Sequence, residues 1–580
     1  MSVVIINDAF YISDMSLCTP ASALSRDSRK TGCWTLVDYA TEDGVEGVTM
    51  YATQENSPPP VRLSLDAEGW HKIFIGIHYT RTSGIVQKGI WGAGGKIKVK
   101  LSGDTAYREV VFEEYTRHAI GKYPTKTGFE SAAWASIQEA YWKAADLTGQ
   151  DIIFSQFAPD EMANVAYVKL VALNDAEMEE ISKTAPNEDT RRLIMCIPTP
   201  MWGGDLHGVN VPRVPDEAEI SEMIEPLRGT DFGAVILSAV RGEICVYPSK
   251  IGRPFGCARG YWNKEWLDPV AQVKSAAAEM DIDFYLSMRM TGATLPPIRF
   301  DHEDSNYYWE NRQFALRDKE GNPASHLSLA FPEVRDYWLS YFRELIDLYD
   351  PDGVNVLFNR SHPYVLYEEP VIESFEQSYG EDPRNIPSDD ERWLRHRAGF
   401  VTLFLREVRG LLDEEGEKRG KRYGTIYHLR LFQRHPQGPL WIAQDAEAWA
   451  KEGLADRILL NTVSLPSETI ADTVRYYKKL VESTNTKIYP DLYPRTNPAE
   501  AYAEKAGVMY EAGADGFAFW GLRHTRISEW AMISMLGHRE LLAGPESADW
   551  IEKAKSYYRR VPLKLLNGLV ANPELSYTDG

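Results

Sequence analysis

The sequence contains few cysteines and no long apolar segment. Its 580 residues include five cysteines, odd in number and widely spaced, at Cys18, Cys33, Cys196, Cys245 and Cys257. This spacing fits neither a disulfide framework nor a CxxC metal site, so we expect reduced, mostly buried thiols. No apolar run approaches the roughly 18 residues that a membrane-spanning helix needs, which argues against a membrane partner.

Positive charge is also scarce. The chain has 63 Lys and Arg against 84 Asp and Glu, a formal net charge of −21. Phosphate binding needs surplus cation, so nucleic acid and anionic membranes are not expected partners. The N-terminus has no basic segment, and Asp8 interrupts its short apolar run, so no signal peptide is expected. The chain as given predicts a cytoplasmic protein; removal of a leader would make it secreted or periplasmic.

What the sequence does contain is typical of a globular protein. Hydrophobic residues make up 44% and charged residues 25%, which excludes disordered and fibrous classes. Aromatic residues reach 12%, with 16 Trp and 31 Tyr. Aromatic rings stack on sugar rings, but they also fill large cores. Aromatic content alone therefore does not decide between the two.

The first part of the chain predicts a β-sandwich. Up to about residue 175, short runs alternate between apolar and polar residues and are separated by turn residues, as at 61–65, 72–78, 96–101, 151–154 and 166–171. This period of two indicates an antiparallel, jelly-roll-like sandwich over residues 1–175, either carbohydrate-binding or structural. Residues 176–190 are expected to form a linker.

From residue 191 the pattern changes to strand, loop and helix, repeated eight times. The predicted strands are 192–197, 233–237, 282–288, 353–358, 423–427, 457–461, 486–489 and 515–520. Amphipathic stretches follow them, at 217–227, 270–280, 333–348, 391–419, 468–481, 498–511 and 527–541. This order predicts an α/β fold, a (β/α)8 TIM barrel over residues 191–545, followed by a C-terminal helix and tail over 546–580. No GxGxxG or GxxxxGK[ST] motif follows a strand, so no nucleotide cofactor is expected.

The active site of such a barrel lies where the strands end. Carboxylates that could act as acid and base follow these ends at Glu243, Asp301, Glu303, Glu368, Glu369 and Asp491. Glycosidic cleavage needs two of them, about 5–5.5 Å apart for retention and about 6.5–9.5 Å apart for inversion. Each carboxylate could instead pair with a neighbouring arginine.

Arginines gather at the same strand ends, although the chain is acidic overall. They are Arg241, Arg289, Arg360, Arg430, Arg495 and Arg523. A guanidinium binds a carboxylate or sulfate through two parallel hydrogen bonds, so these side chains suggest an acidic sugar, a uronate or a sulfated residue. The alternative is that they neutralise the nearby carboxylates. The run 301–304, Asp-His-Glu-Asp, lacks HExxH spacing and is read as a solvated loop, so no metal is expected.

Two segments resemble a known group of proteins. They are 327–338, LSLAFPEVRDYW, and 350–360, DPDGVNVLFNR. Together with 367–370, 379–383 and 449–456 they resemble the glycosyl-hydrolase-like TIM-barrel families that are related to family ten glycoside hydrolases. The resemblance covers roughly residues 190–545 and implies a glycoside hydrolase. Many members of these families place an acidic residue near the end of the fourth strand, about where Leu357 lies, whereas this chain continues into Asn359 and Arg360. The resemblance therefore implies either that the acid has moved to Glu368 or that hydrolytic activity has been lost.

The sequence thus predicts a glycoside hydrolase acting on a poly- or oligosaccharide, with Glu368 as general acid and Asp491 as nucleophile or base. Replacing Glu368 by Gln should lower kcat at least about a hundredfold. The predicted substrate-binding residues are Trp202, Arg241, Glu243, Arg289, Asn359, Arg360, Tyr367, His428, Arg430, Tyr493, Trp520 and Arg523. A carbohydrate is the expected partner, and a homo-oligomer is compatible with the sequence.

Three other functions remain open at this point. A polysaccharide lyase would use the arginines to neutralise a uronate, with His428 or Tyr493 as base. A non-catalytic glycan-binding protein would explain the missing acid after the fourth strand. A metal-dependent isomerase or epimerase could use the same barrel. Reducing ends, absorbance near 235 nm, binding without product, and sensitivity to EDTA separate these functions.

Overall fold

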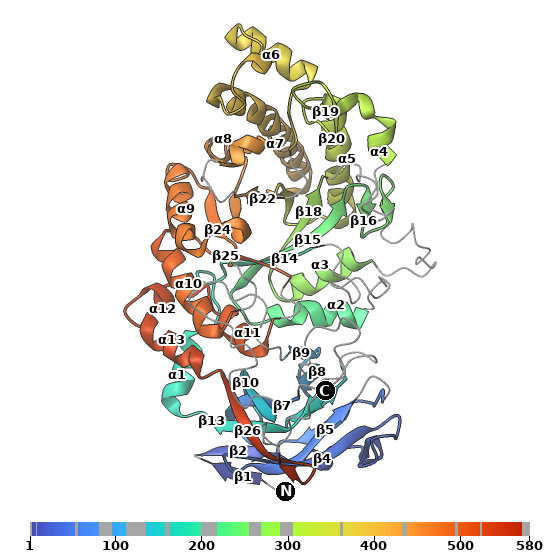
Figure 1. Ribbon diagram of the computed structural model, residues 1–580, viewed down its shortest axis with the longest axis vertical. Coiled ribbons are helices and arrows are strands. Elements are labelled where there is room, and N and C mark those ends of the chain that lie inside the picture. The colour runs from blue at the N-terminus through green and yellow to red at the C-terminus, as the bar shows by residue number, and fades with distance from the viewer. Residues whose placement is uncertain are drawn as a thin grey trace.

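The structure, a computed structural model, consists of a β-sandwich and a barrel of parallel strands surrounded by helices (Figure 1). It describes residues 3–6, 8–52, 56–80, 96–111, 135–156, 163–198, 217–254, 268–290, 306–359, 363–431, 438–492, 497–521 and 525–570. No helix within these ranges is both long enough and apolar enough to span a membrane. The four cysteines they contain are buried and form no disulfide.

Two sheets form the sandwich, and their strands pair antiparallel except for β3, which is parallel to β4. The larger sheet runs in the order β1 (Val3–Ile6), β2 (Ala9–Ile12), β13 (Tyr167–Ala172), β7 (Trp70–Thr80), β10 (Ala135–Asp146), β26 (Tyr558–Leu566), β4 (Trp34–Thr41), β5 (Glu46–Ala52) and β12 (Ala163–Val165), with β3 (Leu24–Ser25) and β27 (Leu569–Val570) at its margins. The smaller sheet is β6 (Val61–Ser64), β11 (Asp151–Ser155), β8 (Lys96–Leu101) and β9 (Arg108–Val111).

Alternating apolar residues explain why the two sheets face each other. Ile73, Ile75 and Ile77 of β7 are buried in one cluster with Ile97 and Val99 of β8. Side chains two residues apart lie on the same face of a strand, so this period of two gives each sheet one apolar face. Burial of that face against the other sheet supplies the main stabilisation of the sandwich.

A strand from the far end of the described chain completes the larger sheet. Residues 546–580 were expected to be a helix and a tail; the helix α13 (Ser547–Lys555) forms, but β26 then pairs antiparallel with β10 and with β4. β26 turns back into β27 through Asn567 and Gly568, whose φ angles are 52° and 77°. Two such residues form the tight turn that suits a hairpin. The alternation of buried and exposed residues in β26, followed by Asn567 and Gly568, is the sequence signal that indicates this hairpin.

Eight parallel strands form the barrel. They are β14 (Leu193–Ile197), β15 (Phe232–Arg241), β18 (Asp283–Arg289), β21 (Gly353–Leu357), β22 (Gly424–Arg430), β23 (Arg457–Asn461), β24 (Lys487–Pro490) and β25 (Phe517–Trp520). From β14 to β24 each pairs with the next, and β14 also pairs with β25. A parallel bridge between Asp491 and Ala518 links β24 to β25. The ring of parallel strands is therefore nearly closed, and the predicted α/β class with eight parallel strands is confirmed.

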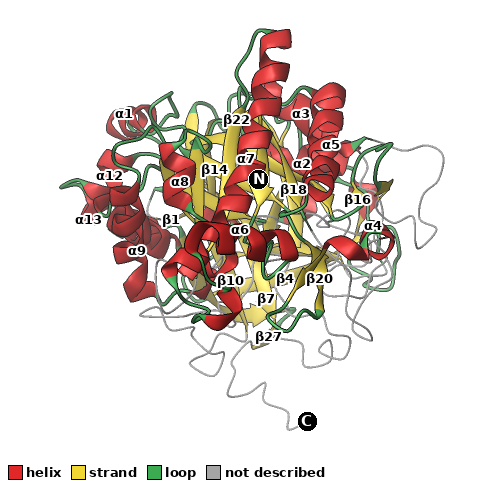
Figure 2. Cartoon of the chain, turned by 90° about the horizontal axis from the view of Figure 1, so that it is seen from above, coloured by secondary structure: helices red, strands yellow, loops and turns green. Residues whose placement is uncertain are grey.

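Helices surround these strands (Figure 2). They are α2 (Glu217–Ile224), α3 (Pro269–Glu279), α5 (Pro332–Tyr349), α7 (Glu391–Arg419), α8 (Ala446–Lys451), α9 (Ser467–Leu480), α10 (Ala499–Glu511), α11 (Ile527–Ile533) and α12 (Arg539–Ala543). The chain also forms α1 (Asp175–Lys183) before the barrel and, in the loops after β15, β18 and β21, the elements β16 (Ile244–Cys245), β17 (Arg253–Pro254), α4 (Asn306–Glu310), β19 (Ala315–Arg317), β20 (Pro323–Leu327) and α6 (Glu369–Tyr379).

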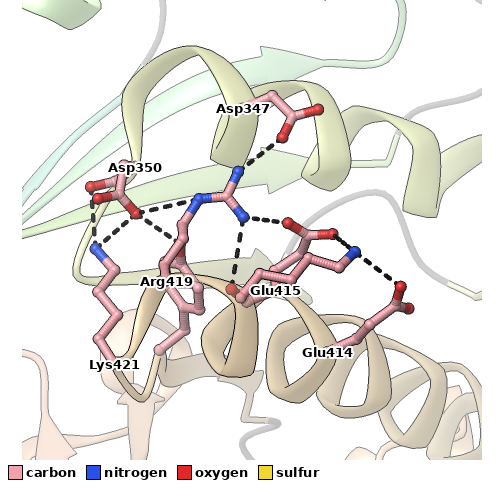
Figure 3. A network of polar contacts seen from close by, with 8 residues as sticks. Asp347, Asp350, Glu414, Glu415, Arg419 and Lys421 are labelled. Atoms are coloured by element: carbon pink, nitrogen blue, oxygen red, sulfur yellow. Dashed lines mark hydrogen bonds and ion pairs between the residues drawn. The ribbon is translucent and has the colours of Figure 1, made fainter.

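Charged side chains fix the turns that enter the barrel strands. Asp350 ends α5 in a left-handed conformation, φ 42°, and its carboxylate binds Lys421 Nζ at 2.7 Å (Figure 3). Arg419, at the end of α7, binds Asp347 of α5 at 2.8 Å. These contacts hold the end of α5 beside the end of α7, and so set the starts of β21 and β22 side by side.

Candidate functional site

The inner face of the barrel leads up to a polar mouth. Ile194, Ile236, Tyr285, Ile426 and Leu459 are buried together in a cluster separate from the outer core. Side chains two residues apart in a strand share a face. The residues at the carboxyl ends of the strands that continue this inner face are therefore those that can meet a ligand: Arg289, Arg430, Asn461, Asp491 and Trp520.

Two of the predicted arginines are neighbours at this mouth. A register shift between Ser238 and Val240 of β15 brings Arg241 directly beside Arg289 of β18 in the parallel ladder. Both side chains are partly exposed. Guanidinium groups recognise carboxylate and sulfate groups, so this pair of residues is a candidate for binding an anionic group of a ligand.

Asp491 directly follows β24, and its carboxylate accepts a hydrogen bond from one side-chain amide. Asn461 Nδ2 donates to Asp491 Oδ2 at 2.7 Å, and Thr462 Oγ1 donates to the Asp491 carbonyl at 2.9 Å. Arg430 Nη1 donates to Asn461 Oδ1 at 3.3 Å, which sets the orientation of the amide. The Asp491 side chain is 6% exposed. The structure thus joins Arg430, Asn461 and Asp491, from three adjacent strands, in one hydrogen-bonded row.

His428 lies below this row, enclosed by protein. Its side chain has no exposed area, and burial lowers its pKa to about 3, so the imidazole is neutral. Asn355 Nδ2 donates to the Ile426 carbonyl at 2.7 Å and contacts His428 Nδ1 at 3.0 Å. Because this nitrogen can only donate, Nδ1 accepts and Nε2 carries the proton. His428 Nε2 lies 3.7 Å from Cys196 Sγ. His428 is therefore fixed in the interior of the barrel.

Aromatic and amide groups complete the described part of the mouth. The Trp520 ring lies 4.8 Å from the His428 ring, measured between centroids. Its indole nitrogen is buried and has no hydrogen-bond partner within the described residues. Asn359, just after β21, is 2% exposed, and its Oδ1 likewise meets no donor in the part of the chain that the structure describes. A buried polar atom in this state can be satisfied by a ligand.

Glu368 is enclosed by hydrogen-bond donors from the protein. Its carboxylate accepts from Arg317 N at 2.9 Å, Ser328 Oγ at 2.8 Å and Leu366 N at 3.0 Å, and the residue is 1% exposed. Burial raises its pKa, although these hydrogen bonds favour the charged form. Arg317 lies in β19 and Glu368 immediately precedes α6, so the carboxylate ties the loop after β18 to the loop after β21.

Other predicted residues have contacts with residues outside this row. Glu243 binds Arg253 Nε at 3.2 Å and accepts from Tyr307 N, which holds it among the loops around β16 and α4. Tyr367 packs on Trp393 of α7, with ring centroids 4.8 Å apart. Glu369 is exposed in the first turn of α6. The predicted residues that lie outside the described ranges are Trp202, Asp301, Glu303, Arg360, Tyr493, Arg495 and Arg523.

Sequence reasoning gave no role to several residues that build this region. Asn461 orients Asp491. Ser287 Oγ donates to Asn355 Oδ1 at 2.6 Å, and this fixes the amide that contacts His428. Gln444 accepts from Arg430 N at 3.1 Å. For Ser287, Asn355 and Asn461 the available signal was a polar residue at alternate positions of an apolar strand, whereas Gln444 lies in the loop before α8. Such strand residues face the barrel interior and need partners there.

No family model and no curated protein sequence matches the chain. Among solved structures it is similar to a putative alpha-L-fucosidase from Bacteroides thetaiotaomicron (11% identity, 62% of this chain and 95% of that one, TM-score 0.34). It is also similar to a chitobiase from Flavobacterium johnsoniae (10%, 69% and 54%, TM-score 0.37) and a cycloalternan-degrading enzyme from Trueperella pyogenes (11%, 88% and 68%, TM-score 0.35). The fold assignment above rests on the strand ladder of this chain alone.

Proposed function

We propose that the chain is a glycoside hydrolase that acts at the barrel mouth on a glycan carrying carboxylate or sulfate groups. The observation that carries the proposal is the polar row Arg430–Asn461–Asp491, at the same end of the barrel as the adjacent pair Arg241 and Arg289. A buried carboxylate provides the nucleophile or base of glycosidic cleavage. The guanidinium groups provide the recognition of an anionic sugar.

In this proposal, Asp491 attacks the anomeric carbon or activates a water molecule there. The hydrogen bond from Asn461 fixes the carboxylate and stabilises its charged form. The indole N–H of Trp520 and Asn359 Oδ1 have no hydrogen-bond partner among the described residues, and in this proposal they bind sugar hydroxyls. Orientation of the sugar ring by such contacts lowers the barrier to the reaction.

Hydrolysis also requires a proton donor. Glu368 is enclosed by three donors, and Glu243 is paired with Arg253, so both are engaged in holding loops. The remaining sequence candidates are Asp301, Glu303 and Glu369. Each of these five carboxylates is converted to its amide, and kcat and thermal stability are measured for each variant. The proton donor is the residue whose variant loses turnover while its stability is unchanged.

The experiment that tests the function is a screen against neutral, uronate-containing and sulfated polysaccharides. New reducing ends on the anionic glycans, absent in Asp491→Asn, support the proposal. An absorbance near 235 nm instead would indicate a lyase and overturn it. The enclosed, neutral His428 offers no exposed base for lyase chemistry. Cleavage of neutral glycans alone would remove the acidic-sugar part of the proposal.

A further inference from the structure

The side chain of Gln444 joins the ends of two neighbouring barrel strands. Gln444 follows the short 3₁₀ helix η8 (Gly438–Ile442) in the loop between β22 and α8, and it is 1% exposed. Its Nε2 donates to the carbonyl oxygen of Phe358, the residue after β21, at 2.8 Å. Its Oε1 accepts from the backbone N–H of Arg430, the last residue of β22, at 3.1 Å. One side-chain amide therefore connects the two strands where they reach the mouth.

The two backbone groups that bind Gln444 would bind each other if the strands stayed paired. Gly424 N at the start of β22 donates to Asp352 O at 2.9 Å, and the paired residues of β21 end just before Phe358. In a parallel pair the same bond recurs every two residues, so the ladder would next join Arg430 N to Phe358 O. The amide of Gln444 takes the place of that bond. The strand ends are therefore linked through the side chain instead of directly.

The backbone directly before Gln444 adopts an uncommon conformation. Ala443 has a φ of 61° and no exposed area. A positive φ is uncommon for a residue that has a Cβ atom. Such a conformation persists only where the surrounding structure fixes it, and these conformations gather at functional sites. Here Ala443 N donates to Leu440 O at 2.9 Å, and Gln444 N donates to Pro439 O at 3.0 Å. The loop thus holds an unfavourable backbone angle next to the side chain that enters between the strands.

A buried arginine anchors the same loop from the outer side of the barrel. Arg397 of α7 is 3% exposed; its Nη2 donates to Trp441 O at 3.2 Å, and its Nη1 donates to Val365 O at 3.3 Å. Trp441 belongs to η8, and Val365 lies in the loop after β21. One guanidinium therefore fixes the loops that follow both strands. This leaves Gln444 little freedom to move out of its place.

Residues of the proposed site flank Gln444 on both sides. Asn359, which directly follows Phe358, belongs to the end of β21. Arg430 remains paired with Asn461 of β23, and its Nη1 donates to the amide that orients Asp491. Without the Gln444 amide, Arg430 N could donate directly to Phe358 O. The end of β22 would then move toward β21 and away from Asn461.

We infer that Gln444 is a positioning residue of the mouth, which sets the separation between Asn359 and Arg430 and, through Arg430, the orientation of Asn461 toward Asp491. The role requires a side chain of this length with one donor and one acceptor, and an amide has both. The inference rests on the proposed function, because it assigns Gln444 a part in binding an anionic glycan. Its first test needs no glycan.

The first test is a pair of crystal structures, of the native protein and of Gln444→Met. Methionine has a similar length but no hydrogen-bond donor. We expect Arg430 N to lie about 2.9 Å from Phe358 O in the variant, and the contact of Arg430 with Asn461 to be lost. Strand ends that keep their native separation in Gln444→Met overturn the inference, because the loop and not the amide would then hold them apart.

The second test is a rescue by pH. A protonated glutamate has a donor and an acceptor, as glutamine has, whereas the ionised form only accepts; burial raises the pKa of such a carboxyl. Trigalacturonate, trimannuronate and a chondroitin sulfate tetrasaccharide are titrated calorimetrically into Asp491→Asn protein, which prevents turnover. With the added Gln444→Glu we expect a Kd within threefold of this parent at pH 5 and at least tenfold higher at pH 8. Gln377→Glu, exposed on α6, is the control and should match the parent at both pH values.

The outcomes separate the positioning role from the function. If one glycan binds the parent and Gln444→Glu binds it equally well at pH 5 and pH 8, the inference is overturned and the proposed function stands. If no glycan binds the parent and no polysaccharide is cleaved, the proposed function fails. The separation set by Gln444 is then decided by the two crystal structures alone. Since Gln444→Glu is isosteric with the native side chain, its rescue at pH 5 also excludes misfolding as the cause of the loss at pH 8.

Discussion

The Asn461 amide donates to Asp491 Oδ2 at 2.7 Å, while its carbonyl oxygen accepts from Arg430. These two contacts leave the amide only one orientation, with nitrogen toward the carboxylate. Asp491 therefore has one oxygen fixed by β23, and its position depends on the row of side chains across β22, β23 and β24.

Asp491→Asn should abolish most activity. The amide lacks the negative charge that attacks carbon or activates water, and it places a second NH2 group opposite Asn461. We expect kcat to fall at least about a hundredfold, with the melting temperature nearly unchanged, as measured by reducing-end assays and calorimetry. Asp472→Asn, on the exposed side of α9 with 81% of its side chain accessible, is the control and should keep full activity.

Arg289→Met and Arg241→Met should change substrate recognition. Loss of a charge-assisted hydrogen bond costs about 1.5–3 kcal/mol, so KM for a uronate glycan should rise at least tenfold in either variant. KM for neutral glycans should change less than threefold. The exposed Arg475, paired with Asp472 on α9, supplies the control Arg475→Met. Equal changes for both glycan classes would show that these arginines do not select the acidic sugar.

Glu368→Gln should act mainly on stability. The glutamine side chain has one acceptor oxygen where the carboxylate has two, so a buried donor is left unsatisfied at a cost of about 1–3 kcal/mol. We expect a lower melting temperature and a kcat per folded molecule within tenfold of the native value. Ser328→Ala, which removes one of the donors, should produce a smaller effect of the same kind. A hundredfold loss of kcat at unchanged melting temperature would instead make Glu368 the general acid.

The pair of His538 and Asp231 should make stability depend on pH. Burial opposes the charge on His538, but the 2.7 Å hydrogen bond and the charge of Asp231 raise its pKa above 6.5 overall. A raised pKa means that the protonated pair stabilises the fold below pH 6.5 and that this contribution is lost as the pH rises through the folded-state pKa. In urea unfolding, His538→Gln should therefore lose more stability at pH 6 than at pH 9. An equal loss at both values would contradict this.

Arg559→Met should destabilise the sandwich. Glu139 of β10 is 2% exposed and accepts from Arg559 of β26 at 2.7 and 3.0 Å, besides Lys169 and Tyr167. Loss of the guanidinium should lower the free energy of unfolding by about 1–3 kcal/mol, measured with guanidinium chloride. Arg560→Met, on the other face of β26, is the control. A control that destabilises as much would show that general packing of β26 matters more than this charge.

The barrel could be predicted from the sequence because its strands are apolar runs of regular length, each followed by a helix. Every predicted barrel strand overlaps an observed strand. The site was harder to predict from the sequence. Asp491 and Glu368 both follow strands as carboxylates, yet one lies at the mouth and the other is enclosed by Arg317, Ser328 and Leu366. Which protein donors surround a side chain depends on loops that are distant in sequence, and strand periodicity carries no information about them.

Because β26 lies between β10 and β4, the N-terminal sheet lacks an inner strand until residues 558–566 have been synthesised. About 390 residues separate the end of β13 from β26. The edges of β10 and β4 that β26 joins therefore remain unpaired while the barrel is synthesised. Expression of residues 1–175 alone would leave those edges exposed to strands from other molecules, which promotes aggregation. The two parts of this chain are therefore coupled in folding, and an excised sandwich would need β26 supplied in trans.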